Sequence, residues 1–199
     1  MAAYPQWPDQ IWLMRHGETE WSANLRHTGR TDVMLTPAGV LQAKQLARAL
    51  GGRTFALVLT SPLSRASETC RLAGYGDQAV VDEDLLEWDY GEYEGRTRVD
   101  IRRDNPGWTI WTGDLPGGET AEQVALRTKR VIDRLLTANG DVALFAHGHV
   151  LRILATTWLD LAPADGRLLA LDTATLSVLG FENETRVVRQ WNAPTDEHA

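Results

Sequence analysis

Four side chains suited to phosphate chemistry each come at, or shortly after, the end of a short apolar run: Arg15, His16, Arg65 and His147. A guanidinium group can hold two phosphate oxygens at once, and a neutral imidazole can attack phosphorus. If the apolar runs are neighbouring parallel strands, their carboxyl ends meet at one edge of a sheet, where open α/β sheets place their sites. The spacing therefore predicts a pocket for a dianionic phosphate group, with further N–H donors from nearby helix N-termini.

The histidines also suit a metal site. His147 and His149 are two residues apart, so both imidazoles lie on one side of an extended segment, and His16 could supply a third ligand. Arg15 and Arg65 would then place cations beside the metal, which such sites normally avoid. No carboxylate-rich cluster completes the ligand set either. We therefore expect no metal and no other cofactor, and for His149 a supporting or packing role.

Strands and helices alternate along the chain that would position these residues. Apolar runs predict strands at 11–14, 56–59, 79–81 and 142–146, and two closing strands near 175–181 and 186–191. Helices are predicted from Thr36-Pro37 to Gly51-Gly52, from Ser61-Pro62 onward, from a capping box at 120–123, and over about 150–159. A polar loop is expected at 20–35, and a short helix with an irregular excursion at 96–118. This alternation is typical of a parallel sheet.

The chain has the size and composition of one globular domain spanning 1–199, with flexible ends expected at 1–9 and 192–199. Its formal net charge is −7, and nucleic acids and anionic membranes select basic surfaces, so we expect it to bind neither. A local group of arginines can still make one pocket positive. Small anionic ligands therefore remain compatible with the composition.

Cys70 is the only cysteine, so no intrachain disulfide can form, and its helical surroundings predict a buried structural thiol. The N-terminal residues up to Asp9 lack the charged and apolar segments of a signal peptide. No run approaches the roughly 18 apolar residues of a membrane span. We therefore expect a cytoplasmic protein.

Five segments resemble, in the correct order, motifs of the histidine phosphatase superfamily, the phosphoglycerate-mutase-like proteins. They are the Arg-His-Gly signature in 13–19, the second phosphate-binding segment at 61–69, the acid-bearing segment at 87–95, the helix entry at 118–120, and the second histidine in 146–148. The resemblance covers most of the chain, from about residue 11 to residue 152. It implies a three-layer α/β/α sandwich with a mainly parallel sheet.

By position, the resemblance implies that His16 is the nucleophile of a phosphohistidine mechanism and that Glu87 is the proton donor. It also implies three residues that bind the phosphoryl group: Arg15, Arg65 and a protonated His147. Further phosphate-binding positions in the matched loop are Ser22, Thr28 and Gly29. The partners would be a small phosphorylated substrate and inorganic phosphate. No metal is needed in this scheme, because the arginines supply the positive charge.

Glu87 must carry a proton if it is to protonate a leaving alkoxide. Trp88 is its neighbour in sequence, and Trp108 or Trp111 could form a roof, so an apolar wall would favour the neutral acid. After the alcohol has left, the same carboxylate could accept a proton from the attacking water. Trp21, Trp108 and Trp111 are also candidates for substrate contact, and packing against other side chains is an equally supported role for them.

Three departures from the mutases favour hydrolysis. Ser22 stands where they carry asparagine, Arg30 stands where they tend to have an aromatic residue, and the excursion at 96–118 is shorter. The segment 87–95, together with Thr28-Gly29, looks like a branch of acid phosphatases and sugar-phosphate phosphatases. A metal-independent phosphatase for small phosphomonoesters is therefore the leading hypothesis.

Two alternatives stay open at the level of sequence. A cofactor-dependent phosphoglycerate mutase shares the motifs, and a non-catalytic module that binds phosphorylated ligands would need fewer of them. The physiological substrate and the oligomeric state, including a homo-oligomer, are left open by the sequence.

Overall fold

A six-stranded sheet forms the centre of the computed structural model, which describes residues 8–195. The strands are β1 (Gln10–Arg15), β2 (Leu57–Thr60), β3 (Ala79–Val81), β4 (Val142–Ala146), β5 (Leu176–Glu182) and β6 (Thr185–Ala193). Their order is β3-β2-β4-β1-β5-β6. The first four are parallel, whereas β5 is antiparallel to both β1 and β6. The predicted mainly parallel sheet is thereby confirmed.

The predicted strands at 11–14, 56–59 and 142–146, which precede the candidate phosphate-binding residues, are direct neighbours in the sheet. β4 lies between β1 and β2, with Arg15 opposite Ala146 and Thr60 opposite Phe145. The hydrogen-bonded pattern extends one residue beyond β1, where the His16 amide donates to the Ala146 carbonyl over 3.0 Å. The chain therefore leaves all three strands at the same edge of the sheet.

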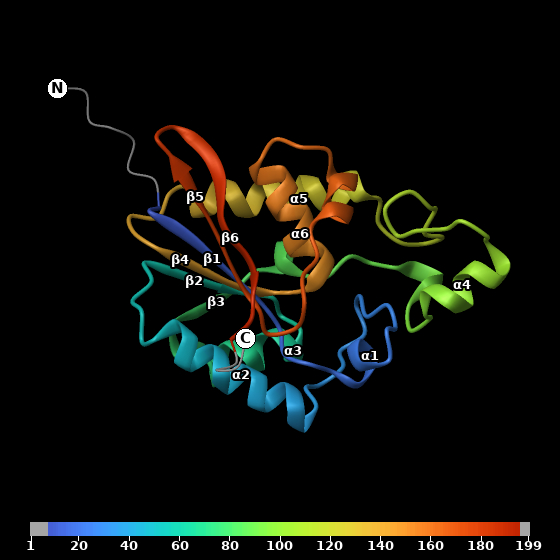
Figure 1. The fold of residues 1–199 in the computed structure, drawn as a ribbon, viewed down its shortest axis with the longest axis horizontal. Coiled ribbons are helices and arrows are strands. Elements are labelled where there is room, and N and C mark those ends of the chain that lie inside the picture. Colours follow the sequence, from blue (N-terminus) through green and yellow to red (C-terminus); the bar gives the residue numbers. More distant parts are fainter. Residues whose placement is uncertain (1–7, 196–199) are drawn as a thin grey trace.

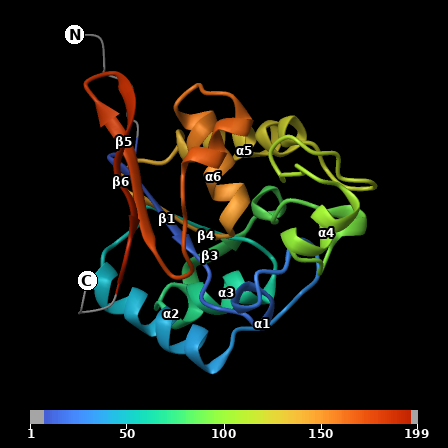
Figure 2. The same cartoon turned by 45° about the vertical axis from the view of Figure 1, so that its right-hand side comes forward.

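Helices cover both faces of the sheet (Figures 1 and 2). On one side lie α2 (Pro37–Leu50) and α3 (Ser64–Leu72), and on the other lie α5 (Ala121–Leu135) and α6 (Gly148–Trp158). β1 shows why both faces are covered: Ile11 and Leu13 belong to the buried cluster under α5 and α6, and Trp12 and Met14 to the cluster with α2 and α3. Side chains of a strand alternate between faces, so a continuous apolar run needs two layers of helices.

Local signals set the ends of α2 and the start of α5 as predicted, whereas α3 begins at Ser64, later than the expected start at Ser61-Pro62. The Thr36 side chain accepts the Gly39 amide over 3.0 Å, Pro37 opens α2, and Gly51 ends it with φ of 58°. At α5, Thr120 and Gln123 form the predicted capping box. In α3, Cys70 is fully buried, and burial raises the pKa of its thiol to about 12. That is the environment of a structural thiol.

Two expectations about irregular segments need correction. Residues Glu20–Ala23 form the short helix α1 inside the expected loop, because Thr19 and Ser22 cap each other reciprocally. At the other end, β6 continues to Ala193, and the Thr195 hydroxyl donates to the Ala174 carbonyl over 3.0 Å. The expected flexible end at 192–199 is therefore paired in its first part. Residues 1–7 and 196–199 lie outside the described residues.

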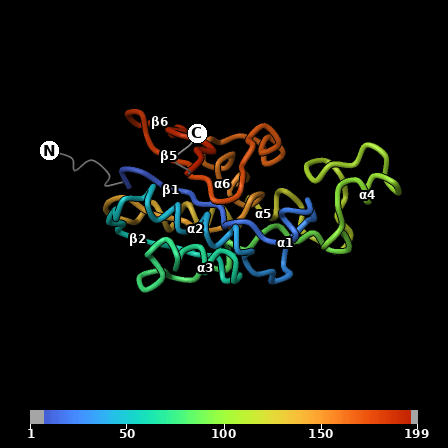
Figure 3. The backbone as a smooth tube through the Cα atoms, turned by 60° about the horizontal axis from the view of Figure 1, so that its bottom comes forward, coloured from blue at the N-terminus to red at the C-terminus, as the bar shows by residue number. Residues whose placement is uncertain are grey.

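The excursion at 96–118 contains the expected short helix, α4 (Arg98–Asp104). It lies at the end of the molecule opposite the start of β1, beyond the carboxyl ends of the parallel strands (Figures 1 and 3). An antiparallel bridge between Arg26 and Thr97 joins it to the loop that follows α1. Short 3₁₀ helices complete the fold at Gly76–Gln78, Glu83–Leu85, Gly91–Tyr93 and Pro163–Leu168. No helix within residues 8–195 has the length and apolar character needed to cross a membrane.

Candidate active site

His16 comes directly after β1 and is almost completely buried. Its Nδ1 lies 2.7 Å from the Gly17 carbonyl, which can only accept, so Nδ1 carries the ring proton and Nε2 keeps its lone pair. Burial, followed by the charges of Arg15 and Arg65, holds the pKa of His16 well below its usual value. The imidazole is therefore neutral and in the tautomer that leaves Nε2 able to act as a nucleophile.

Arg15 provides an unused donor beside this imidazole. Its Nη1 donates to the Leu171 carbonyl over 2.5 Å, while its buried Nε has no hydrogen-bond partner among the described residues. Gly148 makes the space for the guanidinium, since a Cβ at that position would lie 3.3 Å from both Cζ and Nε of Arg15. A buried cation with an unpaired N–H favours an anionic ligand.

Arg65 and His147 form a buried pair. Arg65 Nε donates to Nδ1 of His147 over 3.1 Å, so the ring proton is on Nε2, which lies 2.7 Å from Ser61 Oγ. Burial, and then the charge of Arg65, holds the pKa of His147 well below its usual value. The structure therefore favours the neutral form of His147, because its Nδ1 already accepts a hydrogen bond from a cation, and a protonated His147 on the phosphoryl group stays a prediction.

The remaining N–H groups of Arg65 hold the loop after α1. They donate to the carbonyls of Thr31 (2.9 Å), Gly29 (2.8 Å) and Thr28 (3.2 Å). Arg65 and His147 are both fully buried, and the ring of His147 lies edge-on to that of His16 with centroids 5.2 Å apart. The structure thus brings Arg65 and His147 next to His16, but behind the wall of the cavity described below.

Glu87 is fixed by three backbone amides. Its Oε1 accepts from Trp88 (2.9 Å) and Val150 (2.8 Å), and its Oε2 accepts from His149 (2.9 Å). The last two amides belong to the first turn of α6, whose N–H groups have no partner within the helix. A residue 62 positions earlier in the chain therefore caps α6 and comes to lie beside the edge where β1 and β4 end.

The three loop residues predicted to bind phosphate divide into two groups. Ser22 and Thr28 line the cavity, although the Ser22 hydroxyl already donates to the Thr19 carbonyl over 3.0 Å. Gly29 does not line it, and its amide donates to Glu94 Oε1 over 2.8 Å. A Cβ at Gly29 would lie 2.5 Å from the Trp88 carbonyl. Close packing therefore requires glycine at this position, and the amide predicted to bind phosphate is bonded to Glu94 in this structure.

A cavity of about 800 Å³ opens over His16, Arg15 and Glu87. Its walls contain aromatic side chains, among them the predicted roof residues Trp108 and Trp111. Four further arginines line it: Arg26, Arg98, Arg152 and Arg167. Glu87 is the only carboxylate in this lining. The predicted positive pocket therefore exists in a chain whose net charge is −7.

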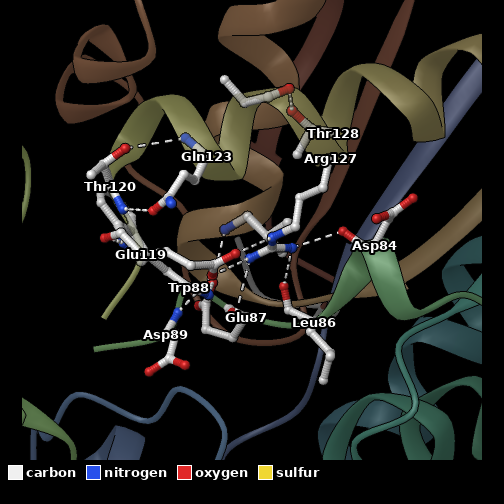
Figure 4. Close-up of polar contacts among 12 residues, drawn as sticks. Asp84, Leu86, Glu87, Trp88, Asp89, Glu119, Thr120, Gln123, Arg127 and Thr128 are labelled. Carbon is white, nitrogen blue, oxygen red and sulfur yellow. Dashed lines mark hydrogen bonds and ion pairs between the residues drawn. The ribbon is translucent and has the colours of Figure 1, made fainter. Parts of the chain in front are cut away.

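Arg127 is a buried residue that the sequence reasoning missed (Figure 4). From α5 it makes a two-point ion pair with Glu119, with distances of 3.0 and 3.1 Å. It also donates to the carbonyls of Asp84, Leu86 and Glu87, and so holds the segment that carries Glu87. The available signal was a charged residue within the apolar stripe of α5, between Val124 and Val131.

Replacing Arg127 with methionine is expected to lower the free energy of unfolding by about 3–5 kcal/mol, because the change leaves three carbonyls without their donor and removes the two-point ion pair of the partly buried Glu119. Urea unfolding measures the loss. Arg130→Met is the matched control, since Arg130 lies on the same helix but pairs with Asp84 through an exposed side chain. Equal losses in the two variants would contradict the proposed support of the Glu87 segment.

The buried neutral histidines also predict a pH dependence of stability. The pKa of both His16 and His147 is lowered, chiefly by burial, so below about pH 6.5 the unfolded chain binds more protons than the folded one. The free energy of unfolding should therefore fall on acidification, by up to about 1.4 kcal/mol per pH unit for each histidine. Urea unfolding between about pH 7 and pH 5 tests this before the carboxylates titrate. A flat profile would show that the pKa of these histidines is the same in the folded and the unfolded chain.

Comparison with known proteins agrees with the fold. The family model of the histidine phosphatase superfamily (branch 1) matches residues 11–194. The chain belongs to this superfamily. An acid phosphatase of Mycobacterium tuberculosis (strain ATCC 25618 / H37Rv) is 39% identical to it over 181 residues, which are 89% of each chain.

Two further proteins extend the comparison. Sedoheptulose 1,7-bisphosphatase of Saccharomyces cerevisiae (strain ATCC 204508 / S288c) is 35% identical over 182 residues, covering 75% of this chain and 67% of that protein. The structure of a mycobacterial glucosyl-3-phosphoglycerate phosphatase with inorganic phosphate has a TM-score of 0.82 at 27% identity, and the match covers 94% of this chain and 98% of that chain. Family membership and these relatives support a phosphatase activity.

Proposed function

We propose that this chain hydrolyses small phosphomonoesters, such as sugar phosphates, through a phosphohistidine at His16 and without a metal ion. The observation that carries the proposal is the state of His16: a neutral ring whose Nδ1 proton is fixed by the Gly17 carbonyl, next to the unpaired Nε of Arg15. The relatives named acid phosphatase and sedoheptulose bisphosphatase support phosphoester hydrolysis and a sugar-phosphate substrate.

In the first step, Nε2 of His16 attacks phosphorus and the bond from phosphorus to the ester oxygen breaks. The phosphoryl oxygens are negatively charged throughout, and Arg15 offers them the N–H that has no other partner. The departing oxygen takes a proton from Glu87. Oε2 of Glu87 accepts a single amide, so it keeps a lone pair on which that proton can be carried.

In the second step, water attacks the phosphohistidine. The Glu87 carboxylate takes the proton of this water, the bond from phosphorus to Nε2 breaks, and inorganic phosphate leaves. His16 returns to its neutral form and Glu87 to its protonated form. Arg65 contributes positive charge through its contact with His147. Direct phosphate binding by Arg65 or His147 would require both to exchange the hydrogen bonds described above.

A phosphate-release screen tests the proposal. Sugar phosphates, nucleotides, phosphoglycerates and phosphopeptides are compared with and without EDTA between about pH 4 and pH 8. Release from small phosphomonoesters that EDTA does not affect is the expected result. Activity that disappears with EDTA and returns with zinc would overturn the metal-independent mechanism. Isomerisation of 3-phosphoglycerate in the presence of bisphosphoglycerate, without phosphate release, would identify a mutase instead.

A further inference from the structure

The peptide unit between Gly17 and Glu18 fixes the state of the His16 ring. Its carbonyl accepts the Nδ1 proton of His16 over 2.7 Å, which is the hydrogen bond that leaves the lone pair on Nε2. A peptide unit is planar and trans, so its C=O and N–H groups point in opposite directions and turn together. Whatever binds the Glu18 N–H therefore also determines where the Gly17 carbonyl points.

The partner of the Glu18 N–H is the side chain of Gln42, at a distance of 2.7 Å. An N–H group can only donate, so the amide oxygen of Gln42 is the atom that faces it. Gln42 lies in α2 and is half-buried, next to the buried stripe of Gly39, Ala43 and Leu46 that packs toward the sheet. A polar side chain beside an apolar helix face thus binds the backbone that follows the nucleophile.

The other backbone groups of this turn are also bound. The Glu18 carbonyl accepts the amide of Thr36, the N-cap of α2, over 3.0 Å. Gly39 permits this close approach, since a Cβ at that position would collide with the Glu18 carbonyl oxygen. On α3, the Thr69 hydroxyl accepts the Gly17 amide over 3.1 Å. The turn after β1 is therefore held by two helices, and α2 supplies both partners of the Glu18 backbone.

We propose that Gln42 is a positioning residue for the reaction: it holds the Gly17–Glu18 peptide unit so that the ring proton of His16 stays on Nδ1. The inference rests on the proposed function, because it concerns the nucleophile of that mechanism. Gln42 does not line the cavity, so it acts through this peptide unit and touches no substrate. Without its acceptor oxygen the peptide unit can turn, and the Gly17 carbonyl then leaves Nδ1. The ring proton can move through water to Nε2, which then has no lone pair for the attack on phosphorus.

Gln42→Leu, which removes the acceptor oxygen, tests the proposal. Its kcat for phosphate release should fall about tenfold or more, while KM stays within about twofold of the wild type, because the residues that line the cavity are unchanged. Gln42→Glu, which keeps an acceptor oxygen at the end of a side chain of the same length, should regain part of this loss. Gln45→Leu is the matched control and should keep the wild-type kcat, since Gln45 is also half-buried and lies three residues further along α2.

The ¹⁵N NMR signals of the His16 ring give a measurement that a general loss of structure would not imitate. A ring nitrogen that carries a proton and one that does not have clearly different shifts, so the spectrum reports the tautomer directly. The wild type and Gln45→Leu should show the proton on Nδ1, whereas Gln42→Leu should show a measurable fraction with the proton on Nε2. Comparison with His16→Ala identifies the two signals, because they are missing from that variant.

The outcomes separate the two proposals. An unchanged His16 spectrum in Gln42→Leu would overturn the role of Gln42, whatever the value of kcat, and so would equal losses of kcat in Gln42→Leu and Gln45→Leu. If Gln42→Leu does not fold, Gln42→Met takes its place, because methionine is closer in size and offers only a weakly accepting sulfur. A wild type that releases phosphate from no phosphomonoester would overturn the proposed function instead. The spectra would then still decide whether Gln42 fixes the ring proton, since they need no turnover.

Discussion

Replacing His16 with alanine is expected to reduce phosphate release by about 10⁴-fold or more, because the variant has no nucleophile to form the covalent intermediate. The neutral tautomer seen here, with Nδ1 donating to the Gly17 carbonyl, is what makes Nε2 available in the wild type. The cavity and the Arg15 guanidinium remain in the variant. The loss should therefore appear in kcat, whereas binding of inorganic phosphate should persist.

Labelling with a ³²P-phosphomonoester and rapid quenching in alkali measures the intermediate itself, since phosphohistidine survives alkali and is lost in acid. The wild type should carry acid-labile label and His16→Ala should carry none. His27→Asn is the comparison, because His27 also lines the cavity and its Nδ1 likewise bonds a carbonyl, that of Arg96, and this variant should still carry the label. Acid-labile label on His16→Ala, or turnover within tenfold of the wild type, would place the nucleophile elsewhere.

The position of His16 was predictable because the strand before it is buried on both faces. Such a strand has a continuous apolar run, and a cation followed by an imidazole ends that run without ambiguity. The same reasoning located His147 after β4, and the short route from β2 into α3 located Arg65. Strand ends that share one edge bring such residues together whatever the details of the loops.

Hydrogen-bond partners were not predictable in this way. Whether His147 is protonated depends on Arg65, a residue 82 positions away, which uses its Nε on the imidazole. Gly29 was expected to offer its amide N–H to phosphate, but that N–H donates to the Glu94 carboxylate. Both outcomes depend on loop contacts between distant parts of the chain, which carry no periodic pattern.

The burial of Arg127 could not be predicted from the sequence either. In sequence it is one arginine in a helix with a strong apolar stripe, and most arginines on helices are exposed. In the fold it is buried, and it satisfies carbonyls of an irregular segment that cannot pair with itself. The segment that carries Glu87 is neither a strand nor a helix, so its buried carbonyls need a donor from elsewhere in the chain, and Arg127 is that donor.

Replacing Glu87 with glutamine is expected to lower kcat by about 10²–10⁴-fold for alkyl phosphates such as sugar phosphates, because glutamine cannot give a proton to the leaving oxygen. The effect should be much smaller for p-nitrophenyl phosphate, whose leaving group departs as a stable anion. The diagnostic quantity is therefore the ratio of the two kcat values. A change in this ratio reports proton donation, since a general loss of structure would slow both substrates alike.

Glu94→Gln provides the matched control for this ratio. Glu94 also accepts two backbone amides, from Gly29 and Thr31, but it does not line the cavity. Glutamine at position 94 can keep the one oxygen that accepts both amides, whereas glutamine at position 87 loses an acceptor of one amide, so Glu94→Gln controls for the loss of a carboxylate charge near the site. Only Glu87→Gln should change the ratio of the two substrates. If both variants leave the ratio as in the wild type, Glu87 serves only to cap α6, and the proton for the leaving group must come from another residue of the cavity or from water.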